Sequence, residues 1–506
     1  MKAFLLLLLL FIIAQPAALV LSYAFNNLSV YSDWGTTIQS ALPELLATTA
    51  QVGIFAICFS LILGGLPAWL THRFSFPGRQ VFSFLVLAPL AVPAVALLGL
   101  YQEATNSEVF SSPSGLGLAF GIACAPYVFL LLRVALARTS PTFREAAKTL
   151  GLGPLQRFLF LHVPLLAIPL LASSALVGSE MLSDFATSER AGVNTFSLAL
   201  HNLWMGTQRN DIAVFLASSV IIALIVTFAF VIFLFQKFTP QNSATGHPRH
   251  QRMRCRPFQA TLVLIACIAA VTPGFLFPIF HTIKWATQKA GTSPLKNLAN
   301  DTFSSVTTSA IVLLLTLAIS LVLVFLLHAQ KQANHLRAVT AVSLFNYAMP
   351  ALVLVLAFFI STNEQTTLAR VFPSLNNTRI PLITATALRF LPFILLPLVD
   401  TLSRIPSSLA MAGRVLGCSE KSAFARVLLP SLKPAIVVGS SLIFVECMKE
   451  ITIAQALRPF EYSALSLRIF NYTTTHQAPE TAVWVLVLQL VIFYPILRLQ
   501  EFIEKE

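Results

Sequence analysis

Charged residues are scarce in this chain of 506 residues, and that scarcity sets the first limits on its class. Asp, Glu, Lys and Arg make up 10% of the residues, whereas soluble globular proteins carry about 25%. Apolar residues make up 56%. This composition excludes a soluble enzyme, a disordered chain and a fibrous protein. It favours a protein that has the lipid bilayer as its solvent, where each charge is costly.

Several motifs of catalysis and metal binding are also missing from the sequence. There is no G-x-x-x-x-G-K-[ST] loop for ATP phosphates, and no H-E-x-x-H or G-x-S-x-G motif. The six cysteines form no C-x-x-C pair, so their spacing supports neither a disulfide framework nor a metal cluster. We therefore expect no catalytic residues, no metal and no cofactor, and any energy from ATP must come from another polypeptide.

Long apolar runs dominate the chain and predict an all-α membrane protein. A helix needs about 20 apolar residues to cross the hydrocarbon core, and about twelve such runs are present. The first run resembles a signal peptide, but it is long and many further runs follow, so we interpret it as a retained helix. The runs are 3–24, 45–70, 79–101, 115–137, 164–185, 212–235, 258–280, 303–327, 336–361, 379–402, 431–455 and 480–500.

The few charges predict how the chain is oriented. Lys and Arg outnumber Asp and Glu by 33 to 20, and the positive residues gather in segments 71–80, 133–157, 236–257 and 404–433. With twelve spans, these segments and both termini lie on one side of the membrane. The positive-inside rule makes that side cytoplasmic. One loop, 281–302, departs from the pattern with three lysines on the opposite side.

An internal repeat divides the sequence into two halves. Residues around Gly151 recur around Gly417 at an offset of 266 residues, and a Pro-Ala step at Pro93 recurs at Pro350 at an offset of 257. Six spans in each copy give both copies the same orientation, which makes the repeat a parallel one. The predicted domains are a first half (1–236), a basic cytoplasmic linker (237–257) and a second half (258–506).

Each half carries a segment that is too polar to span the membrane. Segments 141–163 and 407–429 each read as a short helix, a glycine turn and a second helix. Two interpretations stay open: a helix pair held among lipid headgroups, or a docking surface. Because the segment occurs twice at matching positions, it favours two copies of one partner.

These segments resemble the "EAA" loop of ABC importer permeases, in which the loop docks on the ATP-hydrolysing subunit. The second copy has Met411 where the family has a glutamate. The resemblance covers nearly the whole chain. It implies a type I ABC importer permease fold, two copies of a cytoplasmic ATP-binding subunit and a periplasmic substrate-binding protein. The residues that it implies for ATPase coupling are Glu145, Ala146, Ala147, Gly151, Ala412 and Gly417.

Within that family, two stretches resemble ferric iron permeases. One runs from Glu446 to Glu450 and continues at Leu457, and the other runs from Ser183 to Phe196. The resemblance implies ferric iron as the substrate, moved across the inner membrane by alternating access. Thiamine-type permeases share the fused layout and remain an alternative substrate class. An ion-coupled secondary transporter remains an alternative of a different class.

Charged residues inside the predicted spans are the candidates for the pathway. Two acidic pairs recur at the repeat offset, and because their members are four residues apart we expect each pair to share one helical face. They could line the translocation pathway, contact the binding protein, or lie solvated at the interface. An arginine in the middle of span ten could serve structure or substrate. The candidates are Glu180, Asp184, Arg389, Glu446, Lys449 and Glu450.

Overall fold

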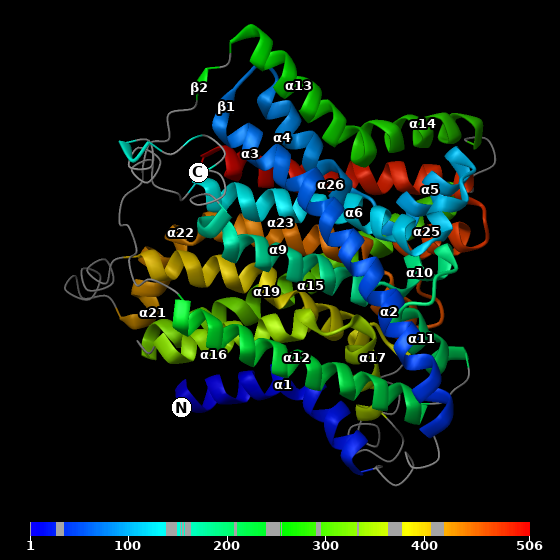
Figure 1. The fold of residues 1–506 in the computed structure, drawn as a ribbon. Coiled ribbons are helices and arrows are strands. Elements are labelled where there is room, and N and C mark those ends of the chain that lie inside the picture. Colours follow the sequence, from blue (N-terminus) through cyan, green and yellow to red (C-terminus); the bar gives the residue numbers. More distant parts are fainter. Residues whose placement is uncertain are drawn as a thin grey trace.

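The structure is a computed structural model dominated by helices that run roughly side by side (Figure 1). It describes residues 2–26, 35–137, 149–151, 153, 156, 163–206, 210–238, 253–254, 256–289, 295–330, 333–362, 377–405 and 419–505. Two short strands, β1 (Phe74–Ser75) and β2 (Met253–Arg254), pair in parallel at one end.

The helices fall into two sets along the chain. The first set is α1 (Lys2–Asn26), α2 (Gly35–Ser60), α3 (Leu66–Arg73), α4 (Arg79–Leu87), α5 (Ala94–Thr105), α6 (Pro113–Ala137), α9 (Val163–Ser183), α10 (Phe185–Ala191), α11 (Phe196–His201) and α12 (Asn210–Phe238). The second set is α13 (Pro257–Val271), α14 (Phe277–Lys289), α15 (Leu295–Gln330), α16 (Ala333–Ala348), α17 (Ala351–Ser361), α19 (Ile380–Arg404), α21 (Glu420–Ala423), α22 (Leu429–Ser431), α23 (Lys433–Lys449), α24 (Thr452–Leu457), α25 (Leu465–Thr474) and α26 (Ala482–Lys505).

The predicted membrane character is confirmed, whereas the predicted count of twelve spans is not. Within the described residues, eight helices are long and apolar enough to cross a membrane, or up to eleven if each of three bent helix pairs is one span. A further, shorter apolar helix covers Asp211–Thr227. The chain is therefore an all-α, multi-pass membrane protein.

Two of the predicted runs are sharply bent rather than straight. The helix axis turns by 96° between α4 and α5 and by 97° between α16 and α17. Pro93 and Pro350 stand at the two bends in extended backbone, each as the N-cap of the following helix. Because proline lacks an N–H, it interrupts a helix but suits the start of the next one. The two bends occupy matching positions in the repeat.

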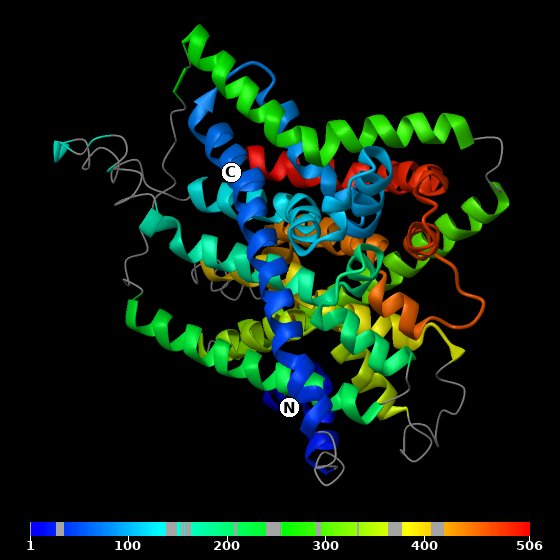
Figure 2. The same ribbon diagram turned by 45° about the vertical axis from the view of Figure 1, so that its right-hand side comes forward.

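The two sets of helices are interleaved rather than placed side by side (Figures 1 and 2). Helix α1 packs against α16 and α17 of the second set, and α13 packs against α3 and α4 of the first. The last helices follow the same rule, since α12 contacts α16 and α17 while α26 contacts α4. Each half therefore lends its first and last helices to the other.

Small residues allow the closest helix contact of the first half. Helix α6 lies against α2, and Gly117 and Gly121 of α6 face it. A Cβ at Gly117 would lie 2.5 Å from the Cβ of Phe55, and one at Gly121 would lie 2.5 Å from the Cβ of Phe59. Small residues four apart are a common device for close helix packing in membranes.

We predict that Gly121→Ala destabilises the protein, although alanine is the better helix former. The added methyl group overpacks the α2–α6 interface, which costs about 1–3 kcal/mol. The midpoint of thermal unfolding of the purified protein in detergent measures the effect. Gly178→Ala in α9 is the control, since a Cβ there meets nothing within 4 Å. Equal stability of both variants would show that the contact is loose.

Candidate functional site

The helix that carries each acidic pair breaks between the two acids. Helix α9 ends at Ser183, and Asp184 has extended backbone and caps α10, accepting hydrogen bonds from the Thr187 amide (2.9 Å) and hydroxyl (2.6 Å). In the second half α23 ends at Lys449, and Glu450 Oε1 accepts from the Ile453 amide (2.9 Å). The expectation that each pair shares one helical face is therefore wrong, because the second acid is used to start a new helix.

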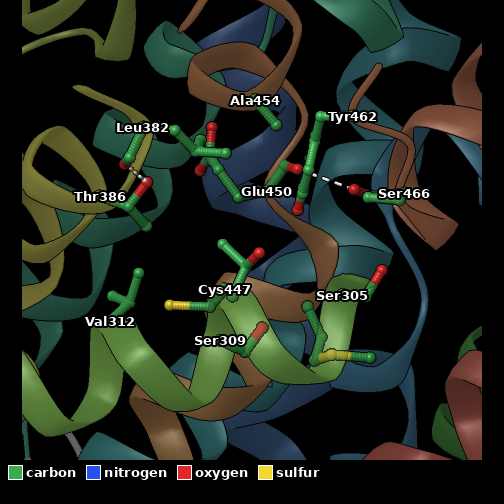
Figure 3. A pocket seen from close by; sticks show the side chains of 13 residues that line it. Ser305, Ser309, Val312, Leu382, Thr386, Cys447, Glu450, Ala454, Tyr462 and Ser466 are labelled. Atoms are coloured by element: carbon green, nitrogen blue, oxygen red, sulfur yellow. Dashed lines mark hydrogen bonds between the residues drawn. The ribbon is translucent and has the colours of Figure 1, made fainter. Parts of the chain in front are cut away.

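Both breaks are supported by the same side-chain hydrogen bond. The Ser197 hydroxyl donates to the backbone carbonyl of Asp184 (3.2 Å), and the Ser466 hydroxyl donates to that of Glu450 (2.9 Å, Figure 3). A carbonyl freed by a helix break is costly in a medium without water unless a donor replaces the lost partner. The serines supply that donor in both halves.

A second matching pair of bonds fixes the segments that follow the breaks. The Phe196 amide donates to the Thr49 hydroxyl (2.9 Å), and the Leu465 amide donates to the Ser305 hydroxyl (2.8 Å). These amides begin α11 and α25, and the hydroxyls lie on α2 and α15. The repeat read from the sequence therefore extends to individual hydrogen bonds around the two acids.

All six charged candidates come together around one central cavity. Its volume is about 70 Å³, and it lies where α6, α9, α19 and α23 approach the bend at Pro93. Arg389 and Glu446 are buried, and the other four are half-buried. The charged lining consists of Glu180, Asp184, Arg389, Glu446, Lys449 and Glu450.

One wall of the cavity holds an acid, a lysine and a tyrosine in contact. Lys449 Nζ lies 3.1 Å from a carboxylate oxygen of Glu446 and donates to the Tyr127 hydroxyl at 2.6 Å. The Tyr127 hydroxyl in turn donates to Glu446. Tyr127 is 3% exposed, so this group is nearly closed to water and the three charges or dipoles satisfy one another.

The opposite wall holds a similar group built on an arginine. Arg389 has a guanidinium nitrogen 3.8 Å from Glu180 and another 3.9 Å from Glu450. The Tyr347 hydroxyl donates to Glu180, and the guanidinium lies 5.5 Å from the Tyr347 ring centre. Arg389 also donates to the carbonyl of Met349 (3.5 Å) beside the bend at Pro350. The arginine of span ten thus has structural partners and also faces the cavity.

The acids obey the repeat, but the cations do not. At the offset of 266 residues, Glu180 matches Glu446 and Asp184 matches Glu450, whereas Arg389 matches Ala123 and Lys449 matches Ser183. Ala123 and Ser183 also line the cavity. Four carboxylates and two cations give the lining a formal charge of −2 when all are ionised. Such a cavity attracts cations and repels anions.

The carboxylates are arranged for pairing rather than for metal coordination. Within the described part of the chain, no group of three or more His, Cys, Asp or Glu side chains is placed to hold a metal ion. Each of the four acids already contacts a cation, a phenol or a helix-starting amide. The cavity is thus suited to a passing cation and not to a resident one.

A smaller cavity, of about 20 Å³, lies on the other side of Glu450 (Figure 3). Hydroxyl groups of Ser305, Ser309, Thr386 and Tyr462 line it together with Cys447. A volume of this size accommodates about one water molecule. Glu450 therefore forms part of the wall between a polar pocket within the second half and the central cavity.

The sequence analysis missed the two tyrosines. Tyrosines in membrane proteins mostly lie at the lipid–water interface, and Tyr127 and Tyr347 were assigned there. Tyr347 is 6% exposed and, like Tyr127, contacts a charged candidate. Their positions inside predicted spans, one turn or more from any end, are the only signal that could have found them.

Of the predicted coupling residues, the structure describes one. Gly151 has φ of +74° and nothing within 4 Å of a hypothetical Cβ, as expected for an exposed glycine turn. Glu145, Ala146, Ala147, Ala412 and Gly417 lie outside the described residues.

The comparisons with known proteins agree with this architecture. The family described as "Binding-protein-dependent transport system inner membrane component" matches residues 56–241 and 336–505. The Fe(3+)-transport system permease protein FbpB 2 of Haemophilus influenzae is 23% identical over 471 residues, which cover 91% of this chain and 90% of that protein.

Two other relatives match only part of the chain. A sulfate transport system permease protein of Salmonella typhimurium is 28% identical over 33% of this chain and 65% of its own length. A putrescine transport system permease protein of Escherichia coli K12 is 27% identical over 33% of this chain and 66% of its own length.

The family matches both halves of the repeat, and a relative with nearly the same length matches the whole. An ABC importer permease is a transport subunit of the inner membrane that works with a binding protein and an ATPase. This replaces the alternative of an ion-coupled secondary transporter. The chain belongs to the binding-protein-dependent transport system inner membrane component family and is a fused, two-repeat ABC importer permease.

Proposed function

We propose that this permease imports ferric iron and that the cation passes through the central cavity. The observation that carries the proposal is the meeting of both acidic pairs, from opposite halves of the chain, around one space with a formal charge of −2. A sulfate dianion would be repelled there. The relative that covers the whole chain is named as an iron permease. Putrescine and thiamine are also cations, so thiamine remains the second candidate.

ATP would drive this transport through two copies of a cytoplasmic ATP-binding subunit. We place their docking sites at segments 141–163 and 407–429 of the halves 1–236 and 258–506, on either side of the linker 237–257. Glu145, Ala146, Ala147 and Gly151 would make the first contact, and Ala412 and Gly417 the second. Closure of the two ATPases would then rock the interleaved halves and alternate access to the cavity.

The proposed orientation puts both termini and both docking segments in the cytoplasm. The positively charged segments support it, and in Figure 1 the N and C labels lie at the same end of the bundle as α21 and α22. A periplasmic binding protein would then deliver substrate at the other end, near Asp184 and Glu450. Membrane lipid would surround the apolar outer faces of the helices.

Neutralising the outer acids should slow uptake. We predict that Asp184→Asn and Glu450→Gln each lower iron uptake at limiting substrate on the order of tenfold. The amide oxygens can still cap α10 and α24, so the substitutions remove charge and leave the helix starts in place. Loss of one charge near a cation corresponds to about 1–4 kcal/mol at 4 Å.

Radiolabelled iron uptake by the complete transporter in proteoliposomes gives the measurement. Asp400→Asn is the matched control, because Asp400 is an exposed acid that pairs with Arg404 away from the cavity. Normal uptake in both cavity variants would remove the acids from the pathway.

The glycine turn should be needed for coupling to the ATPase. We predict that Gly151→Ala reduces co-purification of the ATP-binding subunit about fivefold or more, because a left-handed conformation costs a residue with a Cβ about 1–2 kcal/mol. Gly178→Ala, in a helix and equally free of close neighbours, should leave the complex intact. Full retention of the subunit by the Gly151 variant would contradict the docking site.

Substrate identity can be tested directly in cells. In a strain that lacks its own iron and thiamine importers, expression of the complete system should restore uptake of radiolabelled ferric iron and not of thiamine. The opposite result would assign the chain to the thiamine-type permeases while leaving the cavity and its charge as described.

A further inference from the structure

The central cavity has two acidic layers at different depths. From α6 the cavity is lined by Phe120, Cys124 and Tyr127, and of these Tyr127 lies nearest to Ala137, the end that leads into the first docking segment. Glu180 and Glu446 likewise lie deeper in their helices than Asp184 and Glu450, which stand at the helix breaks. The deeper layer is the one that contains the tyrosines.

Both tyrosine hydroxyls connect the two halves of the chain. Tyr127 of the first half contacts Glu446 and Lys449 of the second. Tyr347 of the second half contacts Glu180 of the first. A hydrogen bond to a charged group is stronger than one between neutral groups, and burial strengthens it further.

The backbone around the two hydroxyl contacts is held separately. Ser179 donates to the backbone carbonyl of Tyr347 (2.7 Å), so this part of α16 stays on α9 whatever the phenol does. Thr452 donates to the carbonyl of Ser183 (2.9 Å) and joins the halves at the upper layer. The phenol groups can therefore change partners by side-chain rotation, without the loss of these backbone contacts.

We propose that Tyr127 and Tyr347 form the cytoplasmic gate of the cavity, and that a cation in the lower layer opens it. A cation bound by Glu180 and Glu446 takes the carboxylate oxygens that accept the phenol O–H bonds. Both hydroxyls then lose their acceptors in the other half, and the rings are free to swing aside. This inference rests on the proposed function, because it assigns a gate to the proposed pathway.

The chain contains a natural reporter for this gate. Cys124 lies on the cavity wall one turn above Tyr127 and is 3% exposed. In a variant that retains Cys124 as its single cysteine, a charged, membrane-impermeant methanethiosulfonate reagent applied to inside-out vesicles reaches it only through the cytoplasmic gate. The vesicles contain the complete transporter without ATP.

The gate variants are Tyr127→Phe and Tyr347→Phe, which keep the rings and remove only the hydroxyls. We expect each to speed the labelling of Cys124 by about tenfold, which corresponds to about 1.4 kcal/mol. Tyr101→Phe is the matched control. The Tyr101 hydroxyl is also buried and also joins the halves, by a bond to the carbonyl of Pro273 (2.6 Å), but it does not line the cavity. Its labelling rate should equal that of the parent.

Thermal unfolding of each variant shows whether the protein is folded, and uptake assays separate the two proposals. Unchanged labelling in both gate variants, or an equal rise in Tyr101→Phe, overturns the gate, and it leaves the pathway standing if Asp184→Asn still lowers uptake. Faster labelling in the gate variants together with normal uptake in the Asp184 and Glu450 variants supports the gate and overturns the iron pathway.

Discussion

The structure depends on one constraint: a helix that breaks inside a membrane must satisfy its freed backbone groups from within the protein. Helices α9 and α23 break at Asp184 and Glu450, and each acid caps the helix that follows. Ser197 and Ser466 take the carbonyls at the breaks. The same acids that solve this backbone problem thereby acquire fixed positions on a central cavity.

The interleaving of the halves gives those breaks their functional setting. Because α1 packs on α16 and α17 while α13 packs on α3 and α4, neither half is a free-standing bundle. The cavity contacts follow this arrangement, since the two phenol contacts each pair one half with the other. A motion driven from the docking segments of the chain would therefore change the cavity from both sides at once.

Much of the fold and of the site could be predicted from the sequence. Charge scarcity gave the membrane class, the offset of 266 residues gave the repeat, and all six charged candidates do meet at one cavity. The helix breaks could not be predicted, because Glu180 and Asp184 have a spacing that also fits an unbroken helix. The phenol contacts could not be predicted either, because Tyr127 and Glu446 are 319 residues apart and match no shared motif.

The departure from symmetry is as informative as the repeat itself. A perfectly two-fold cavity would carry four acids with no cation, and desolvation would make so many unpaired charges very costly. Arg389 and Lys449, both from the second half, reduce that cost without removing the negative excess. Their counterparts Ala123 and Ser183 leave the first half uncharged at these two positions. One half thus supplies the counter-ions for both, so that the cavity keeps a net attraction for cations while every acid has a partner to exchange.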